Sequence, residues 1–151
     1  MRKVQKILTP IKDKYDLSYD DLFSKLSEID IPLDIFVKEL GSFEAIVKYL
    51  KENLGYTYHE ISELLNRDER TIWNSYNKSK KKYSARIISR KSKFSLPVSA
   101  IKDRKLSVLE SIVTHLKENC LLSYAQISKL LQRNFKTIWT VYYRARKKNE
   151  R

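Results

Sequence analysis

The stretch "YAQISKLLQRNFKTIWTVYYRARKK", from Tyr124 to Lys148, decides the fold because its helical pattern changes phase in the middle. Apolar residues at three-and-four spacing run to Leu131, and a second apolar pattern begins at Ile138. Asn134 lies between the two patterns and is a good N-cap for a new helix. We therefore expect two short helices joined by a brief turn, the second ending in basic residues.

An earlier part of the chain repeats this pattern. A shift of 66 residues aligns residues 44–82 with residues 110–148, and roughly half of the positions are identical without a gap. With one inserted residue the likeness extends upstream, where Pro32 and Pro97 each suit a first helical turn. The chain therefore contains a duplicated unit of about 50 residues.

Each unit should contain three helices. The apolar stripe of the first helix is Phe43, Ile46, Val47 and Leu50 in one unit, and Leu109, Ile112, Val113 and Leu116 in the other. Capping boxes that start the second helix are Thr57 with Glu60, and Ser123 with Gln126. The first helix should end near Gly55, whereas Leu121 stands at that place in the second unit and adopts a left-handed conformation less cheaply.

The predicted fold is all-α. Only 2 Gly and 3 Pro occur in 151 residues, which argues against a turn-rich all-β chain. We expect two tandem helix-turn-helix units of the three-helix type. The boundaries are an acidic helical N-terminal segment at 1–30, a first repeat at 31–83, a basic linker at 84–95 and a second repeat at 96–151.

Two of these segments allow alternative interpretations. In the N-terminal segment, "LSYDDLFSKL" echoes "LSYAQISKLL", so it is either a degenerate third unit or an independent helical segment capped by Ser18. The independent segment would cover the first repeat or mediate self-association. The linker is either solvated with phosphate contacts, or its centre, through Ile87 and Ile88, prolongs the third helix or docks on a repeat.

Charge is segregated along the chain. The net charge is +13, but residues 1–69 carry 10 basic against 14 acidic side chains, and residues 70–151 carry 21 against 4. A concentrated positive charge favours a polyanion such as nucleic acid, and more weakly an anionic membrane surface. The N-terminus lacks the apolar run of a signal peptide, and no stretch approaches the roughly 18 apolar residues of a membrane span. We expect a cytoplasmic, nucleoid-associated protein.

Residues typical of enzymes and metal sites are scattered or missing. The sequence has no Gly-rich phosphate loop, no Ser-His-Asp grouping and no carboxylate pair in apolar surroundings. His59, His115 and the single Cys120 lie at unrelated positions, which does not suit a metal ion. We expect a protein that is not an enzyme and needs no cofactor or metal.

The second repeat, "LSYAQISKLLQRNFKTIWTVYYRARKK" from Leu122 to Lys148, resembles the DNA-binding fourth region of bacterial sigma factors and related helix-turn-helix regulators. This resemblance implies that the third helix of each repeat lies in the major groove. The implied base-reading residues are Glu69, Arg70, Trp73, Asn74 and Asn77 in the first repeat, and Phe135, Lys136, Trp139, Thr140 and Tyr143 in the second. Two positions depart from the pattern: Asn66 or Gln132 replaces the turn glycine, and Arg67 or Arg133 the apolar residue after it.

Hydroxyl, aromatic and basic residues around these helices and in the linker are candidates for phosphate contacts. They are Thr57, Tyr58, Arg67, Thr71, Lys78, Lys80, Lys81, Lys82, Arg86, Arg90, Lys91, Lys93, Ser123, Tyr124, Lys129, Arg133, Thr137, Arg144, Arg146, Lys147 and Lys148. For Trp73 and Trp139 two interpretations stay open: each indole closes the edge of the small core, or it lies against sugar or a thymine methyl in the groove.

The function we expect is sequence-preferring binding of double-stranded DNA by a transcriptional regulator whose two units act as a covalent pseudo-dimer. The second repeat should bind more strongly, because residues 107–151 carry 9 basic against 3 acidic side chains, and residues 42–82 carry 8 against 6. The alternative is an architectural protein that bridges or coats DNA with little sequence preference. RNA polymerase is a further possible partner of the N-terminal half, and RNA is a weaker candidate.

Overall fold

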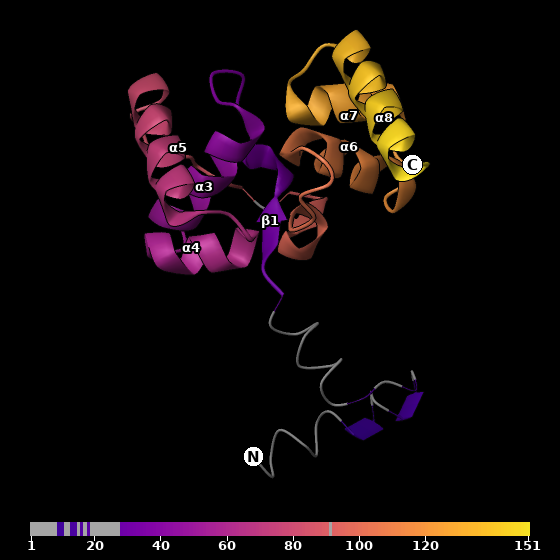
Figure 1. Cartoon of the computed structure of the whole chain (residues 1–151), viewed down its shortest axis with the longest axis horizontal. Coiled ribbons are helices and arrows are strands. Elements are labelled where there is room, and N and C mark those ends of the chain that lie inside the picture. Colours follow the sequence, from indigo (N-terminus) through magenta and orange to yellow (C-terminus); the bar gives the residue numbers. More distant parts are fainter. Residues whose placement is uncertain (1–8, 11–12, 15, 17, 19–27, 91) are drawn as a thin grey trace.

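The computed structural model describes residues 9–10, 13–14, 16, 18, 28–90 and 92–151. In that part of the chain the structure is mostly helical, as the sequence predicts, with one short two-stranded sheet in addition (Figure 1). Most of the acidic N-terminal segment at 1–30, and with it both interpretations of that segment, lies outside the described residues.

Both repeats contain the same elements in the same order. The first has β1 (Asp30–Pro32), the 3-10 turn η1 (Leu33–Ile35), α3 (Ser42–Glu52), α4 (Tyr58–Leu65) and α5 (Glu69–Lys82). The second has β2 (Ser95–Pro97), η2 (Val98–Ile101), α6 (Val108–Glu118), α7 (Tyr124–Leu131) and α8 (Phe135–Asn149). Each repeat thus has the three expected helices, and its proline precedes a 3-10 turn rather than an α-helix.

Side-chain caps fix where the helices begin. The Thr57 hydroxyl accepts from the Glu60 backbone N–H at 3.2 Å, and the Glu60 carboxylate accepts from the Thr57 N–H at 2.7 Å. Ser123 and Gln126 make the same two bonds at the start of α7. The N-caps of α5 and α8 are Asp68 and Asn134. The capping boxes predicted from the sequence are therefore present in both repeats.

The turns that join the second and third helices have the same backbone geometry. Asn66 has φ of 50° and Gln132 has φ of 51°, both in the left-handed region. Glutamine adopts this conformation less readily than asparagine, yet Gln132 leaves the geometry of the turn unchanged. The Ser128 hydroxyl donates to the Arg133 carbonyl oxygen across the turn, while the equivalent Ser62 donates within its own helix. This extra bond offsets part of the cost of a left-handed glutamine.

Leu121 also lies in the left-handed region, with φ of 55° and a side chain that is 83% exposed. Replacing Leu121 with glycine is expected to raise the free energy of unfolding by about 0.5–1 kcal/mol, because relief of backbone strain exceeds the added freedom of the unfolded chain. Urea denaturation measures the change. Gly55→Ala is the matched control, and it should lower stability because Gly55 has φ of 74°, which an alanine adopts only with strain. An added Cβ at this position would meet no atom within 4 Å, so backbone strain alone is measured. A less stable Leu121→Gly protein would contradict the strain argument.

The two repeats are joined by an antiparallel pairing of their equivalent strands. Ile31 of β1 lies opposite Leu96 of β2, and these two residues also correspond in the duplication. Two equivalent strands that pair antiparallel about equivalent central residues are related by an approximate two-fold axis through that pair. Figure 1 looks nearly along this axis: α4 at the lower left corresponds to α7 at the upper right, and α5 to α8.

Each repeat also packs on the second helix of the other. The η1 turn of the first repeat contacts α7, and the η2 turn of the second contacts α4. The guanidinium of Arg133 donates to the Leu40 carbonyl oxygen at 2.6 Å, across the boundary between the repeats. The buried apolar residues of both repeats form a single cluster. The repeats therefore share one core and are not two separately packed units.

The basic linker is docked on the first repeat. Ile87 is buried in the common core, while Ile88 is 81% exposed. The side-chain amide of Asn53 donates to the Ile87 carbonyl oxygen at 2.9 Å, and the Ser89 hydroxyl donates to the Asp34 carboxylate at 2.8 Å. Of the interpretations of this segment, docking through Ile87 is confirmed, and α5 ends at Lys82 without being prolonged into the linker.

Candidate nucleic-acid interface

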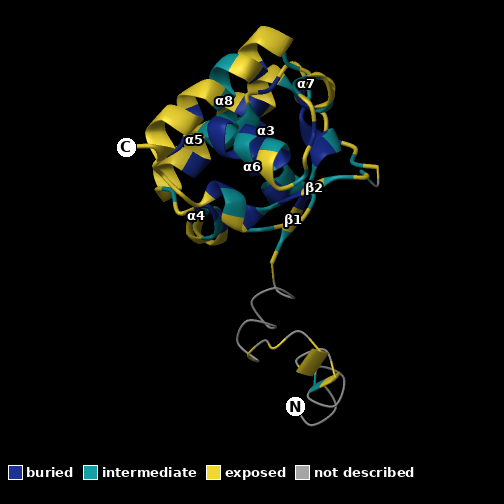
Figure 2. Ribbon diagram, turned by 90° about the vertical axis from the view of Figure 1, so that its right-hand side faces the viewer, coloured by how far each residue is buried: buried dark blue, intermediate teal, exposed yellow. Residues whose placement is uncertain are grey.

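The third helices, α5 and α8, lie at the two lateral edges of the molecule with α3 and α6 between them (Figure 1). Figure 2 shows both third helices on one side of the molecule and the β1–β2 sheet on the other. The approximate two-fold axis runs from the sheet toward the side that carries α5 and α8. That side therefore presents one third helix from each repeat.

Matched contacts hold the third helices on their repeats. Ile72 of α5 and Ile138 of α8 are fully buried. The Tyr76 hydroxyl donates to Glu52 at 3.1 Å, and the Tyr142 hydroxyl donates to Glu118 at 3.0 Å. The four matched contact residues are Glu52, Tyr76, Glu118 and Tyr142. The anchoring role of the two glutamates was not predicted from the sequence, although both occupy equivalent positions of the duplication.

A polar and cationic row runs along the outer side of each third helix at a spacing of four residues. The row is Arg70, Asn74 and Lys78 on α5, and Lys136, Thr140 and Arg144 on α8. Within the described part of the chain none of the four cationic side chains of these rows forms an ion pair. Residues four apart lie on the same face of a helix, so the side chains of each row are neighbours on the helix surface. Both rows therefore present positive charge that the protein itself does not neutralise.

A second row, next to the first, differs between the repeats. On α8 it is aromatic: Phe135, Trp139 and Tyr143 are each about half exposed. The Trp139 and Tyr143 rings stack with centroids 5.5 Å apart and an interplanar angle of 4°. The corresponding residues of α5 are Glu69, Trp73 and Asn77. The two helices thus offer different chemistry beside a similar cationic row.

The tryptophans do not close the edge of the core. Trp73 is 52% exposed and Trp139 is 50% exposed, and neither belongs to the core or to the half-buried residues packed against it. The core-edge interpretation is therefore wrong for both indoles. The other interpretation, in which they contact a bound partner, is the one that their exposure allows.

Two of the candidate phosphate ligands are held by carboxylates of the first helices. The Lys82 ammonium lies 2.9 Å from Glu44, and the Lys148 ammonium lies 2.8 Å from Glu110. Burial raises the pKa of the Glu110 carboxyl, but hydrogen bonds from Lys148 and from Ser107 outweigh it, so the pKa lies below its ordinary value. These lysines pin the ends of α5 and α8 to α3 and α6.

The ion pair of Glu110 gives stability a dependence on pH. Since folding lowers this pKa, the contribution is complete above the ordinary pKa of a glutamate and is lost as the pH falls through the lowered value. Glu110→Gln should therefore cost about 1 kcal/mol at neutral pH and progressively less below about pH 4. Urea denaturation of both proteins from about pH 7 to about pH 3 tests this. A difference that stays constant over this range would contradict the assignment.

The turn arginines have partners inside the molecule. Arg133 donates to the Leu40 carbonyl oxygen, and Arg67 donates to the Leu65 carbonyl oxygen at 3.1 Å. Burial, and secondly the nearby Arg104 of the second repeat, lower the pKa of Arg67. Both arginines thus lie at the boundary between the repeats. These internal contacts give each arginine a packing role at the position where the family pattern has an apolar residue, and phosphate contact by the two side chains stays a prediction.

The tyrosines at the start of the second helices also pack internally. The Tyr58 ring lies 5.9 Å from the Tyr76 ring and beneath the Lys51 ammonium. The Tyr124 ring lies between Phe135 and Tyr142, at 5.9 Å from each. These rings help to fix the angle between the second and third helices, which was not expected from the sequence.

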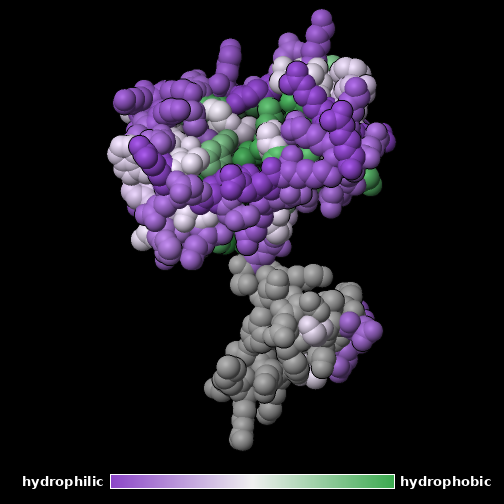
Figure 3. Space-filling model, in the orientation of Figure 1, coloured by the Kyte–Doolittle hydropathy of each residue, from purple (hydrophilic) through white to green (hydrophobic). Residues whose placement is uncertain are grey.

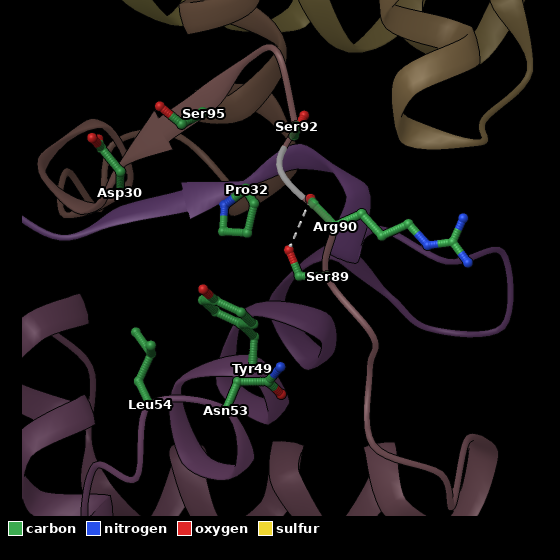
Figure 4. A pocket seen from close by; sticks show the side chains of 9 residues that line it. All are labelled: Asp30, Pro32, Tyr49, Asn53, Leu54, Ser89, Arg90, Ser92 and Ser95. Carbon is green, nitrogen blue, oxygen red and sulfur yellow. Dashed lines mark hydrogen bonds between the residues drawn. The ribbon is translucent and has the colours of Figure 1, made fainter.

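The described linker cations make their contacts outside the third helices. Arg86 donates to the Asn53 carbonyl oxygen at 3.4 Å, and Lys93 lies 5.7 Å from the Phe94 ring centroid. Arg90 belongs to a shallow pocket that also includes strand residues Asp30 and Ser95, and its side chain points out of that pocket (Figure 4). The described linker cations therefore contact the end of α3 and the neighbourhood of the β1–β2 sheet, and phosphate contact by them stays a prediction. Lys91 lies outside the described residues.

The remaining candidates are on the surface. Thr71, Lys80, Lys81, Lys129, Thr137, Arg146 and Lys147 are exposed, and Thr57 and Ser123 are exposed caps. Figure 3 shows the side that carries α5 and α8 as mostly hydrophilic, with apolar atoms gathered between the repeats. A surface of this kind suits a polar, charged partner better than an apolar one. None of the helices in the described residues is long and apolar enough to span a membrane.

No protein-family model, no curated protein and no solved structure matches this chain. Similarity therefore assigns no family. What the described residues offer is a pair of related helices with unpaired cations on one side of a single core.

Proposed function

We propose that the protein binds double-stranded DNA with a sequence preference and acts as a transcriptional regulator, with α4–α5 and α7–α8 as two helix-turn-helix units. The observation that carries this proposal is the unpaired cationic row on each third helix, with both helices on one side of the molecule. A helix fits the major groove, and unpaired cations attract phosphate and guanine.

The outer rows supply the groups that base reading requires. Arg70 and Lys136 are the candidates for guanine O6 and N7, and Asn74 is the candidate for adenine. The exposed aromatic row of α8, which includes Trp139, suits contact with thymine methyl groups. Each favourable pairing discriminates against the wrong base by about 1–3 kcal/mol. We propose that Arg144 and the exposed lysines near the ends of the helices hold the phosphates.

The second repeat should contribute more of the affinity. Glu60 and Glu63 on α4 are replaced by Gln126 and Lys129 on α7, which removes negative charge beside the third helix. In the first repeat Glu69 stays at the start of α5, where Phe135 stands on α8. Fewer acidic groups mean less repulsion of the phosphates.

Selection of bound duplexes from a random pool of DNA tests the proposed function. We expect enrichment of a shared sequence that spans two major-groove segments about 34 Å apart. Enrichment of nothing above the starting pool, together with binding that falls steeply with salt, would favour an architectural protein that coats or bridges DNA. No binding to any duplex would reject both functions.

A further inference from the structure

The relation between the repeats bears on how the two DNA half-sites are oriented. Ile31 and Leu96 are equivalent residues and face each other across the antiparallel strands, so the repeats are related by an approximate two-fold axis. Two units related by translation along a duplex meet half-sites in the same direction. Two units related by a two-fold axis meet half-sites in inverted directions, because the symmetry of the duplex follows that of the protein.

The axis points toward the side that would face the DNA. The sheet lies on one side of the molecule, and α5 and α8 lie on the other, to either side of the axis (Figures 1 and 2). The cationic rows of α5 and α8 occupy equivalent positions of the duplication, so the axis relates them as well. One straight duplex crossing this side along the line from α5 to α8 would meet one third helix from each repeat.

The spacing between the rows is fixed by packing. The η1 turn contacts α7, the η2 turn contacts α4, and Arg133 bonds to the Leu40 carbonyl oxygen. The linker does not allow the repeats to move relative to each other, because Ile87 is buried in the common core and the Ser89 hydroxyl donates to the Asp34 carboxylate. The repeats cannot slide along a duplex independently, as units on a flexible tether would.

The half-sites should also be unlike. The row beside the cations is Phe135, Trp139 and Tyr143 on α8, but Glu69, Trp73 and Asn77 on α5. An aromatic row favours thymine methyl groups, whereas a carboxylate and an amide favour hydrogen-bonding base edges. The two repeats thus share one backbone arrangement but would contact bases through different side chains.

We propose that the protein recognises two unlike half-sites in inverted orientation at one fixed spacing, with the more thymine-rich half-site under α8. This inference rests on the proposed function. It differs from a flexible tandem binder, for which direct half-sites and several spacings would serve equally well.

The test uses the full chain and the duplex enriched from the random pool, with dissociation constants measured by fluorescence anisotropy at one salt concentration. Three derivatives are compared with it: one with a single half-site reversed in place, one with about 5 base pairs inserted between the half-sites, and one with about 10 inserted. We expect reversal, and insertion of half a turn, each to weaken binding about 100-fold, to the level of a single half-site. Insertion of a full turn should weaken it similarly, because the spacing is fixed.

Matched variants assign each half-site to its helix. Arg70→Ala should remove base preference only in the half-site under α5, and Lys136→Ala only in the half-site under α8, at positions related by inversion. Equal affinity for the reversed duplex, tolerance of the insertions, or enrichment of a single half-site would each overturn the inference while leaving sequence-preferring DNA binding intact. Enrichment of no sequence at all would overturn the proposed function and this inference with it.

Discussion

Replacing Leu96 with alanine is expected to lower the free energy of unfolding by about 2–5 kcal/mol and to destabilise both repeats together. Leu96 is fully buried and lies opposite Ile31 on the axis that relates the repeats. Removing its side chain leaves a cavity in the one core that the two repeats share. The loss is therefore expected in a single transition, with no stage in which one repeat remains folded alone.

Each third helix carries one tryptophan, which allows the repeats to be followed separately. In Trp139→Phe the fluorescence of Trp73 reports on the first repeat, and in Trp73→Phe the fluorescence of Trp139 reports on the second. Urea midpoints of the two probes should shift by the same amount when Leu96→Ala is added. Ile88→Ala is the control, because Ile88 is 81% exposed and should change stability little. A shift confined to the second repeat would show that the repeats unfold independently.

Replacing Lys136 with alanine is expected to weaken binding to the enriched duplex by about 10- to 100-fold, or about 1–3 kcal/mol, and to remove preference at one base position. Lys136 is exposed on the outer side of α8, and its side chain has no ion pair among the described residues. Its loss therefore removes a contact with DNA and not a contact that stabilises the fold. Anisotropy titrations against duplexes that differ at single positions measure the change.

Arg146→Ala is the matched comparison on the same helix. Arg146 is exposed and near the end of α8, where a phosphate contact should weaken all sequences alike and lower the salt slope by about one. Its surface ion pair with Glu150, at 3.4 Å, contributes little to stability. If both variants weaken all duplexes uniformly, Lys136 does not read a base.

The helices of both repeats could be predicted from the sequence because their signals are local. Apolar spacing located α3 and α6, and capping boxes at Thr57 and Ser123 located the starts of α4 and α7. The strands could not be predicted in this way. A strand of three residues is too short for a period of two to stand out, and β1 and β2 are about 65 residues apart in the chain.

The outward position of Arg70 and Asn74 on α5, and of Lys136 and Thr140 on α8, could also be predicted, because 100° per residue separates the buried side of a helix from its outer side. The sequence could not predict which of the cationic side chains remain without an ion pair. Lys82 pairs with Glu44 and Lys148 with Glu110, each across 38 residues, and no local pattern indicates these pairs. The duplication does indicate that the two pairs are related, because Glu44 corresponds to Glu110 and Lys82 corresponds to Lys148. The internal contact of Arg133 could not be predicted for a related reason: its partner, the Leu40 carbonyl oxygen, belongs to the other repeat.

The most direct test of base reading by α5 and α8 is the ratio of two dissociation constants, measured for the enriched duplex and for an unrelated duplex of equal length at the same salt concentration. Specific binding through two major-groove helices predicts a ratio of about 10³ or more in favour of the enriched duplex. Equal affinities would contradict the central claim, because the cationic rows would then serve only to hold the phosphate backbone.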